Sequence, residues 1–165
     1  MQVAGHSRPL GDGDIIESVL AQNLYGVDVD GDAVRHTRMM LWMNGGLSTA
    51  PPSELGQHIR RGNTLVGPDF VQFVSESHSD SDDDVELGAH PFHWMSCFPE
   101  VFSNPNPGFD CIIGNPPYVK LQHFRRSQPK VARYLLAATH LDGTPRYESV
   151  SGRNFDLYVP FIERG

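Results

Sequence analysis

Two consecutive prolines, Pro116 and Pro117, follow an apolar run at residues 109–114, and this junction restricts the folds open to the chain more than any other feature. A proline has no amide hydrogen, so neither residue can continue a ladder of strand hydrogen bonds. The apolar run therefore predicts a buried strand that ends at Gly114 and leads into a stiff loop. Open α/β sheets bind their ligands at the carboxyl ends of their strands, where this loop begins.

Apolar patterns elsewhere in the chain predict further helices and strands. Apolar residues at helical spacing indicate helices, and short apolar runs bounded by polar residues indicate strands. In chain order these are a helix at 14–22, a buried strand at 24–29, a helix from Asp30 or Asp32 to about Met43, a short strand at 58–61 and a final helical segment at 155–162. This order is typical of the α/β class with a parallel sheet.

Two segments carry additional constraints. Proline is costly inside a helix, so the final helical segment must kink at Pro160 or begin close to it. The stretch from Pro91 to Phe102 is dense in aromatic residues and is predicted to face the core.

The net charge of −7 is distributed unevenly along the chain. The Ser- and Asp-rich stretch at 75–88 cannot bury apolar area, and it is predicted to be a disordered acidic insertion. Residues 119–146 are basic, with six Lys and Arg residues against one Asp: Lys120, Arg125, Arg126, Lys130, Arg133 and Arg146 against Asp142. This segment is either an ordinary solvated face or a surface for nucleic acid.

Composition argues against several other classes of protein. No apolar run approaches the roughly 20 residues that a membrane helix needs, and the first residues lack the pattern of a signal peptide, so a cytoplasmic location is expected. Cys97 and Cys111 lie among apolar residues and are predicted to be buried thiols. His90 and His93 lack a third ligand nearby, so no metal site is predicted.

The loop after the apolar run offers an unusual set of chemical groups. Asn115 and Pro116 each precede a proline and are biased toward extended conformations. The loop therefore presents backbone carbonyls and the Asn115 side-chain carbonyl beside the aromatic face of Tyr118. Two acceptors that hold both N–H groups of an exocyclic amine, such as that of adenine, would free its lone pair for an incoming methyl group. A plain Pro-Pro turn is the alternative interpretation.

These residues resemble the adenine-specific DNA methyltransferases with an Asn-Pro-Pro-Tyr motif, in particular the large enzymes of restriction and phage-defence systems. The resemblance covers most of residues 20–165, and the other segments that carry it, in the family's order, are 23–42, 61–67, 91–102 and 154–165. It implies a Rossmann-like sheet that binds S-adenosyl-L-methionine, and DNA with a flipped adenine as the partner.

The resemblance also implies roles for individual residues. Asp28 matches the acid that accepts hydrogen bonds from the cofactor ribose, with a helix cap or a solvated carboxylate as the alternative. Asn63 matches the position that contacts the amine of the cofactor adenine, which its side-chain carbonyl can accept from, with an ordinary Gly-Asn turn as the alternative. The catalytic roles fall on the loop residues Asn115, Pro116, Pro117 and Tyr118.

One part of the family pattern is missing. The glycine-rich turn that holds the methionine end of the cofactor should precede Asp28, but only Gly11 and Gly13 are available, and the spacing is too short. The expected fold is therefore a partial methyltransferase sheet over residues 1–165, an internal fragment or truncated form without the first cofactor strand and the C-terminal strands. Further restriction-modification subunits, or missing parts of the same polypeptide, are possible partners.

The sequence thus predicts methyl transfer from S-adenosylmethionine to the N6 amine of adenine in DNA, within a restriction-modification or phage-defence system. An inactive truncated relic or an accessory DNA-binding module is the first alternative, favoured by the missing glycine turn. A methyltransferase acting on RNA or on protein glutamine is the second. The long spacer between Asn63 and Asn115 favours the large DNA enzymes over that second alternative.

Overall fold

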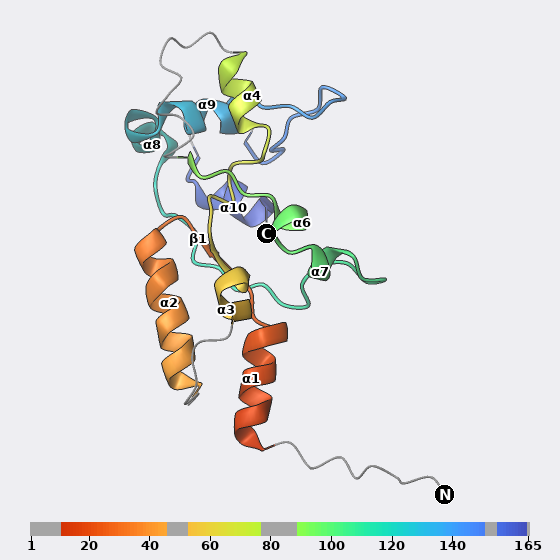
Figure 1. The fold of residues 1–165 in the computed structure, drawn as a ribbon. Coiled ribbons are helices and arrows are strands. Elements are labelled where there is room, and N and C mark those ends of the chain that lie inside the picture. Colours follow the sequence, from red (N-terminus) through yellow and green to blue (C-terminus); the bar gives the residue numbers. More distant parts are fainter. Residues whose placement is uncertain (1–10, 46–52, 77–88, 151–154, 165) are drawn as a thin grey trace, which may run out of the picture. The chain divides into compact units, whose positions relative to one another are not determined.

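The computed structural model describes residues 11–45, 53–76, 89–150 and 155–164 (Figure 1). The chain divides into two compact units, an N-terminal unit Met1–Arg61 and a C-terminal unit Gly62–Gly165. Within the described residues, no helix is long and apolar enough to cross a membrane.

The described residues of the N-terminal unit form a small parallel sheet and three helices. In chain order these are α1 (Asp12–Gln22), β1 (Gly26–Asp28), α2 (Gly31–Asn44), α3 (Ser53–His58) and β2 (Ile59–Arg61). β1 and β2 pair in parallel, with Asp28 opposite Arg61. Because parallel strands cannot be joined by a tight turn, α2 and α3 occupy the connection between them.

Apolar side chains of α2, α3 and β2 form the core of this unit. Val34, Leu55 and Ile59 are buried there, and Leu41 packs against them. Arg38 lies on the same face of α2 as Val34, although it is charged, and its hydrogen bonds explain this position. Its guanidinium donates from Nη2 to the carbonyl oxygen of Gly56 at 2.7 Å and from Nε to that of Ile59 at 2.8 Å. Helix and strand are thereby fixed to one another by polar as well as apolar contacts.

The C-terminal unit is helical in the part of it that the structure describes. Its helices are α4 (Phe70–Ser75), α6 (Trp94–Cys97), α7 (Pro99–Phe102), α8 (Leu121–Ser127), α9 (Pro129–Ala137) and α10 (Tyr158–Arg164). α9 lies against both α4 and α8 (Figure 1). Tyr134 of α9 is fully buried, and the rings of Phe70 and Phe73 of α4 meet its ring edge-on, each at 5.4 Å between centroids.

Several predicted elements are confirmed. The helices predicted at 14–22 and from Asp30 or Asp32 correspond to α1 and α2, and Asp30 caps α2 by accepting a hydrogen bond from the Asp32 amide at 2.8 Å. The aromatic stretch 91–102 does face the core, since Phe92, Phe98 and Val101 are buried. α10 begins at Tyr158, so Pro160 lies in its first turn, where a proline is tolerated.

The buried strand predicted at 109–114 is wrong. These residues form no strand in the described structure, and the side chain of Ile113 is 94% exposed. An apolar run supplies strand propensity, but a strand forms only where a neighbour accepts and donates its backbone hydrogen bonds. Within the described residues the only strands belong to the N-terminal unit. Cys111, which lies in this run, is exposed, and Cys97 in α6 is only half-buried, so the prediction of two buried thiols is also wrong.

Two other boundaries differ from the predictions. β1 is shorter than the predicted strand 24–29 and is half-buried rather than buried, with Asp28 exposed. Ser75, predicted to begin the acidic insertion, closes α4, and Glu76 caps that helix. Residues 77–88 of the predicted insertion lie outside the described residues. The arrangement as a whole is compatible with the α/β class, and the larger Rossmann-like sheet stays a prediction.

Candidate functional site

Asp28 lies at the carboxyl end of β1, directly before the turn into α2. Its Oδ1 accepts a hydrogen bond from the Asp30 amide at 2.8 Å, and its side chain is exposed. Among the described residues its second carboxylate oxygen has no hydrogen-bond partner. An exposed carboxylate at the end of a parallel strand provides the acceptors that the vicinal hydroxyls of a ribose require. Asp28 is not the cap of α2, since Asp30 fills that position.

Asn63 is held in a tight loop at the start of the C-terminal unit. Its amide donates to the carbonyl oxygen of His90 at 2.7 Å, and its own carbonyl oxygen accepts from the Val66 amide at 3.0 Å. The side-chain Oδ1 accepts from the Leu65 amide at 3.1 Å. The residue thus forms the Gly-Asn turn that was its alternative interpretation, and its side-chain oxygen has a second lone pair beyond the bond to Leu65.

Gly62 and Gly67, at the two ends of this loop, are required by close packing. A Cβ at Gly62 would lie 2.3 Å from Cδ2 of Phe92, and a Cβ at Gly67 would lie 2.8 Å from the hydroxyl of Tyr134. Neither glycine has a positive φ, so steric approach rather than backbone conformation accounts for both.

Two buried tyrosines fasten the same loop to the C-terminal half of the unit. The Tyr134 hydroxyl accepts from the Gly67 amide at 3.1 Å and donates to Asp69 Oδ1 at 2.8 Å. The Tyr147 hydroxyl donates to the Leu65 carbonyl oxygen at 2.6 Å. Burial raises the pKa of Tyr147 to about 12, and burial together with the hydrogen bond to Asp69 raises that of Tyr134 further. Both tyrosines therefore stay protonated and keep their donor roles at physiological pH.

The proline loop at 115–118 lies at the surface of the C-terminal unit. Asn115 is exposed, Pro116 and Pro117 are half-buried, and the Tyr118 side chain is 78% exposed. The loop thus presents its amide and its aromatic ring to solvent, which is the arrangement that binding of a planar ligand requires.

The segment that leads into α10 anchors both sides of this loop. The Leu157 amide donates to the Val119 carbonyl oxygen at 2.9 Å, and the Leu121 amide donates to the Phe155 carbonyl oxygen at 3.0 Å. On the other side, a Cβ at Gly114 would come within 3.0 Å of the Phe161 ring. The loop is therefore held in place without a preceding strand.

Tyr158, at the start of α10, is a residue that the sequence analysis missed. Its ring lies 6.5 Å from that of Tyr118 between centroids, with a tilt of 38° between the planes, and it is 38% exposed. An exposed aromatic residue in the segment that resembles the family's following helix was the available signal.

Arg146 does not belong to an open basic surface, in contrast to the prediction for residues 119–146. Its guanidinium pairs with Asp69, with 2.7 Å between Nη2 and Oδ2, and its side chain is only 16% exposed. Among the described residues, no group of His, Cys, Asp and Glu side chains could hold a metal ion.

The family model of the Eco57I restriction-modification methylase matches residues 22–165. The chain belongs to this family. No curated protein and no solved structure gives a match.

Membership in the Eco57I restriction-modification methylase family identifies the chain as a DNA methyltransferase domain of restriction-modification. The predicted resemblance to this class is thereby confirmed. The matched range contains Asp28, Asn63 and the proline loop, and methyltransferases of this kind typically use S-adenosylmethionine. The roles of these individual residues and the specificity for adenine stay predictions.

Proposed function

We propose that this domain transfers a methyl group from S-adenosyl-L-methionine to the N6 amine of adenine in DNA, and that the loop Asn115–Tyr118 holds the base. The observation that carries the proposal is the exposure of this loop together with its contacts to α10 and to the segment before it. A rigid loop that faces solvent can receive a base that has left the duplex, which is how enzymes reach an atom inside the base stack.

The acceptors of the loop would act on the amine of the base. The Asn115 side-chain carbonyl and a backbone carbonyl of the proline pair would each accept one N–H of the amine. Positive charge develops on the amine nitrogen during methyl transfer, so these hydrogen bonds strengthen in the transition state and lower the barrier. Neither proline offers an amide hydrogen that could compete for the acceptors. Tyr118 would hold the base by stacking.

The cofactor supplies an electrophilic methyl group when it is bound. Asp28 is the residue best suited to hold its ribose, because the carboxylate is exposed and keeps one oxygen without a partner among the described residues. Asn63 would contact the amine of the cofactor adenine through its side-chain carbonyl, because Oδ1 accepts one hydrogen bond from the Leu65 amide and has a second lone pair.

The experiment is to identify the methylated product. Duplex DNA, single-stranded RNA and glutamine-containing protein substrates are incubated with methyl-labelled cofactor, and the modified residue is identified after hydrolysis. N6-methyladenine from DNA is the expected product. Label in RNA or in glutamine would support the neighbouring class of enzyme instead.

Asn115→Ala should lower the rate of methyl transfer by about 10²-fold or more, since it removes a transition-state hydrogen bond. The matched control is Asn106→Ala, because Asn106 is also exposed and also lies directly before a proline. The control should transfer methyl groups at the wild-type rate. An equal loss in both variants would contradict the role of Asn115.

One observation favours an accessory binding module as the second candidate. Gly11 is the N-terminal cap of α1, and Gly13 lies within that helix, so neither forms a turn between a strand and a helix. Residues 11–27 therefore offer no glycine cradle for the methionine end of the cofactor among the described residues. Calorimetry with S-adenosylmethionine separates the candidates, since the module would bind DNA without binding the cofactor.

A further inference from the structure

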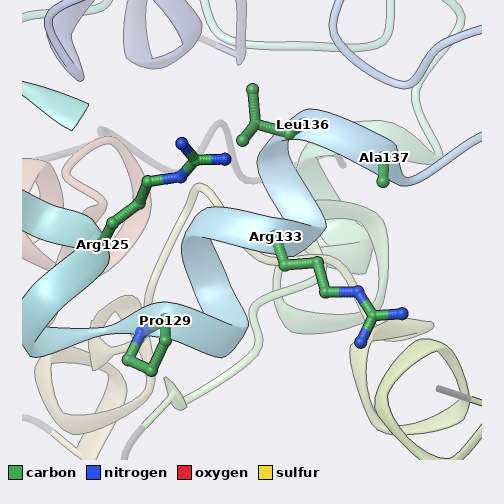
Figure 2. Close-up of a pocket in the computed structure, with 5 residues that line it drawn as sticks. All are labelled: Arg125, Pro129, Arg133, Leu136 and Ala137. Atoms are coloured by element: carbon green, nitrogen blue, oxygen red, sulfur yellow. The ribbon is translucent and has the colours of Figure 1, made fainter. Parts of the chain in front are cut away.

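A shallow pocket lies between α8 and α9 of the C-terminal unit. Its volume is about 420 Å³, and the residues that line it are Arg125, Pro129, Arg133, Leu136 and Ala137 (Figure 2). Four of the five are exposed and the fifth is half-buried, so the pocket is open to solvent. Its rim is cationic and its floor is apolar.

The charged residues within the two helices are all of one sign. Residues 121–137 contain three Arg and one Lys and no acidic residue. Among the described residues, neither Arg125 nor Arg133 forms an ion pair, whereas Arg146 is already paired with Asp69. The pocket therefore favours an anionic ligand.

The directions of the two guanidinium groups indicate the shape of that ligand. In Figure 2 the side chain of Arg125 reaches from α8 toward Leu136, and that of Arg133 points away from it. The Arg133 guanidinium lies 5.8 Å from the centroid of the Phe73 ring, a cation–π contact that holds it in this direction. Groups that diverge do not enclose one small anion, but they can contact separate phosphates of an extended strand. The apolar floor offers a surface for the sugars between those phosphates.

The position of α8 in the chain relates this pocket to the proline loop. α8 begins at Leu121, directly after the loop, and the Leu121 amide is fixed to the Phe155 carbonyl oxygen. Both features belong to the C-terminal unit, so a strand held in the pocket is held by the element that continues the loop.

We propose that the α8–α9 pocket is a subsite for the DNA sugar-phosphate backbone, in which Arg125 and Arg133 contact separate phosphates. The inference rests on the proposed function, because it assigns a part of the same DNA substrate. Such contacts position the duplex and carry no information on its sequence.

The test measures binding of the 165-residue chain to a labelled DNA duplex as a function of salt concentration. Each phosphate contact contributes about 0.9 to the slope of log affinity against log salt. Arg125→Gln and Arg133→Gln should each make that slope shallower by about this amount. Arg125→Lys and Arg133→Lys keep the charge and should preserve most of it.

Two control variants distinguish a defined pocket from general basic character. Arg126→Gln removes one positive charge from α8, the helix that also carries Arg125, but Arg126 does not line the pocket. Arg35→Gln removes an exposed charge of the N-terminal unit that pairs with Asp32. Both should keep the wild-type slope. Equal losses for Arg125 and Arg126 would overturn the inference, as would an unchanged slope in both pocket variants.

Competition experiments define the ligand. Inorganic phosphate should compete weakly, because one small anion cannot span diverging guanidinium groups, and tight binding of free phosphate would overturn the strand proposal. Preference for single-stranded RNA over the duplex would overturn the choice of DNA.

Methyl transfer is assayed in parallel with the same variants. If only the proposed function is wrong, the pocket variants still change the salt dependence of DNA binding, but no N6-methyladenine is formed. If only the pocket inference is wrong, N6-methyladenine is formed and the pocket variants leave the salt dependence unchanged.

Discussion

Tyr118 presents a nearly free aromatic face on a loop whose backbone is fixed by two prolines. Its nearest aromatic neighbour is Tyr158, which approaches it at a tilt rather than face to face. A tilted neighbour leaves one face of the Tyr118 ring open for a planar ligand, and it limits the rotation of the ring. We therefore expect the ring, and not the hydroxyl, to be the part of Tyr118 that matters.

Substitution of Tyr118 tests this expectation. Tyr118→Phe keeps the ring and should retain most of the methyl transfer, whereas Tyr118→Ala should weaken base binding by about 1–3 kcal/mol. Binding is measured with a duplex in which the target base is mismatched, because such a base is more easily flipped. If the Phe variant fails as badly as the Ala variant, the hydroxyl is needed and stacking is not the main role.

Gly62 shows how a single residue fixes the loop that carries Asn63. Gly62→Ala places a methyl group within 2.3 Å of the Phe92 ring, and overpacking of this kind destabilises by about 1–3 kcal/mol. Gly56→Ala is the control, because nothing lies within 4 Å of a Cβ there and the residue is in α3. That change should be neutral or stabilising. Urea unfolding measures the free energy of unfolding of both variants. Equal stability of the two variants would show that the Phe92 ring moves aside without a loss of stability.

At the scale of the elements, the sequence predicted the structure that depends on local interactions and missed structure that depends on residues far apart in the chain. α1 and α2 are visible in the sequence because their caps and apolar spacing are local, and Asp30 caps α2 in the structure. The apolar run at 109–114 failed because strand formation depends on a partner elsewhere in the chain. α9 was missed although Val131, Tyr134 and Leu135 have helical spacing and are buried.

The same difference between local and long-range interactions applies to the candidate site. The proline loop is recognisable from sequence because its chemistry lies in consecutive residues. Other contacts join residues far apart in the chain, namely the ion pair of Asp69 with Arg146 and the hydrogen bonds of Tyr134. No local sequence pattern indicates them. Candidate residues whose groups lie in consecutive positions could therefore be proposed from the sequence, whereas the contacts that hold them in place could not.

α10 is tied to the preceding turn by one carboxylate, and this contact makes a prediction about pH. Glu163 accepts hydrogen bonds from the amides of Glu148, at 2.7 Å, and Ser149, at 3.1 Å, and from the Ser149 hydroxyl. Burial alone would raise the pKa of Glu163, but these hydrogen bonds outweigh it and the pKa is lowered. A lowered pKa means that the stabilisation is present above the unfolded-state pKa and is lost as pH falls through the folded-state value.

The measurement is the free energy of unfolding of the wild type and of Glu163→Gln from neutral to acid pH. The wild type should be the more stable protein at neutral pH, and the difference should shrink as the pH falls below the ordinary range of glutamate. Glu148→Gln removes the same charge but keeps the donating amide, so it should follow the wild type. A difference that is constant with pH would show that the Glu163 carboxylate has no preferential partner in the folded state.

At the scale of the whole molecule, the proposed ligand of the cofactor ribose and the proposed ligand of the target amine belong to different compact units. Asp28, the proposed ribose ligand, belongs to Met1–Arg61, and Asn115, the proposed amine ligand, belongs to Gly62–Gly165. Each role is supported by surroundings within its own unit: the end of β1 for Asp28 and the anchored loop for Asn115. Binding of the cofactor and stabilisation of the transition state should therefore be separable by substitution.

Asp28→Asn should raise the KM for S-adenosylmethionine and leave kcat nearly unchanged, because a ribose contact is made equally in the ground state and in the transition state. Asn115→Ala should lower kcat by about 10²-fold or more with little change in KM, because its hydrogen bond strengthens only as charge develops on the amine. In the double variant the two effects on free energy should add, since residues without shared partners are usually additive within about 0.5 kcal/mol. Steady-state kinetics of the four proteins provide the test. A fall in kcat for Asp28→Asn with no rise in KM would contradict its assignment as a ribose ligand, and strong non-additivity would show that the two residues act on one step.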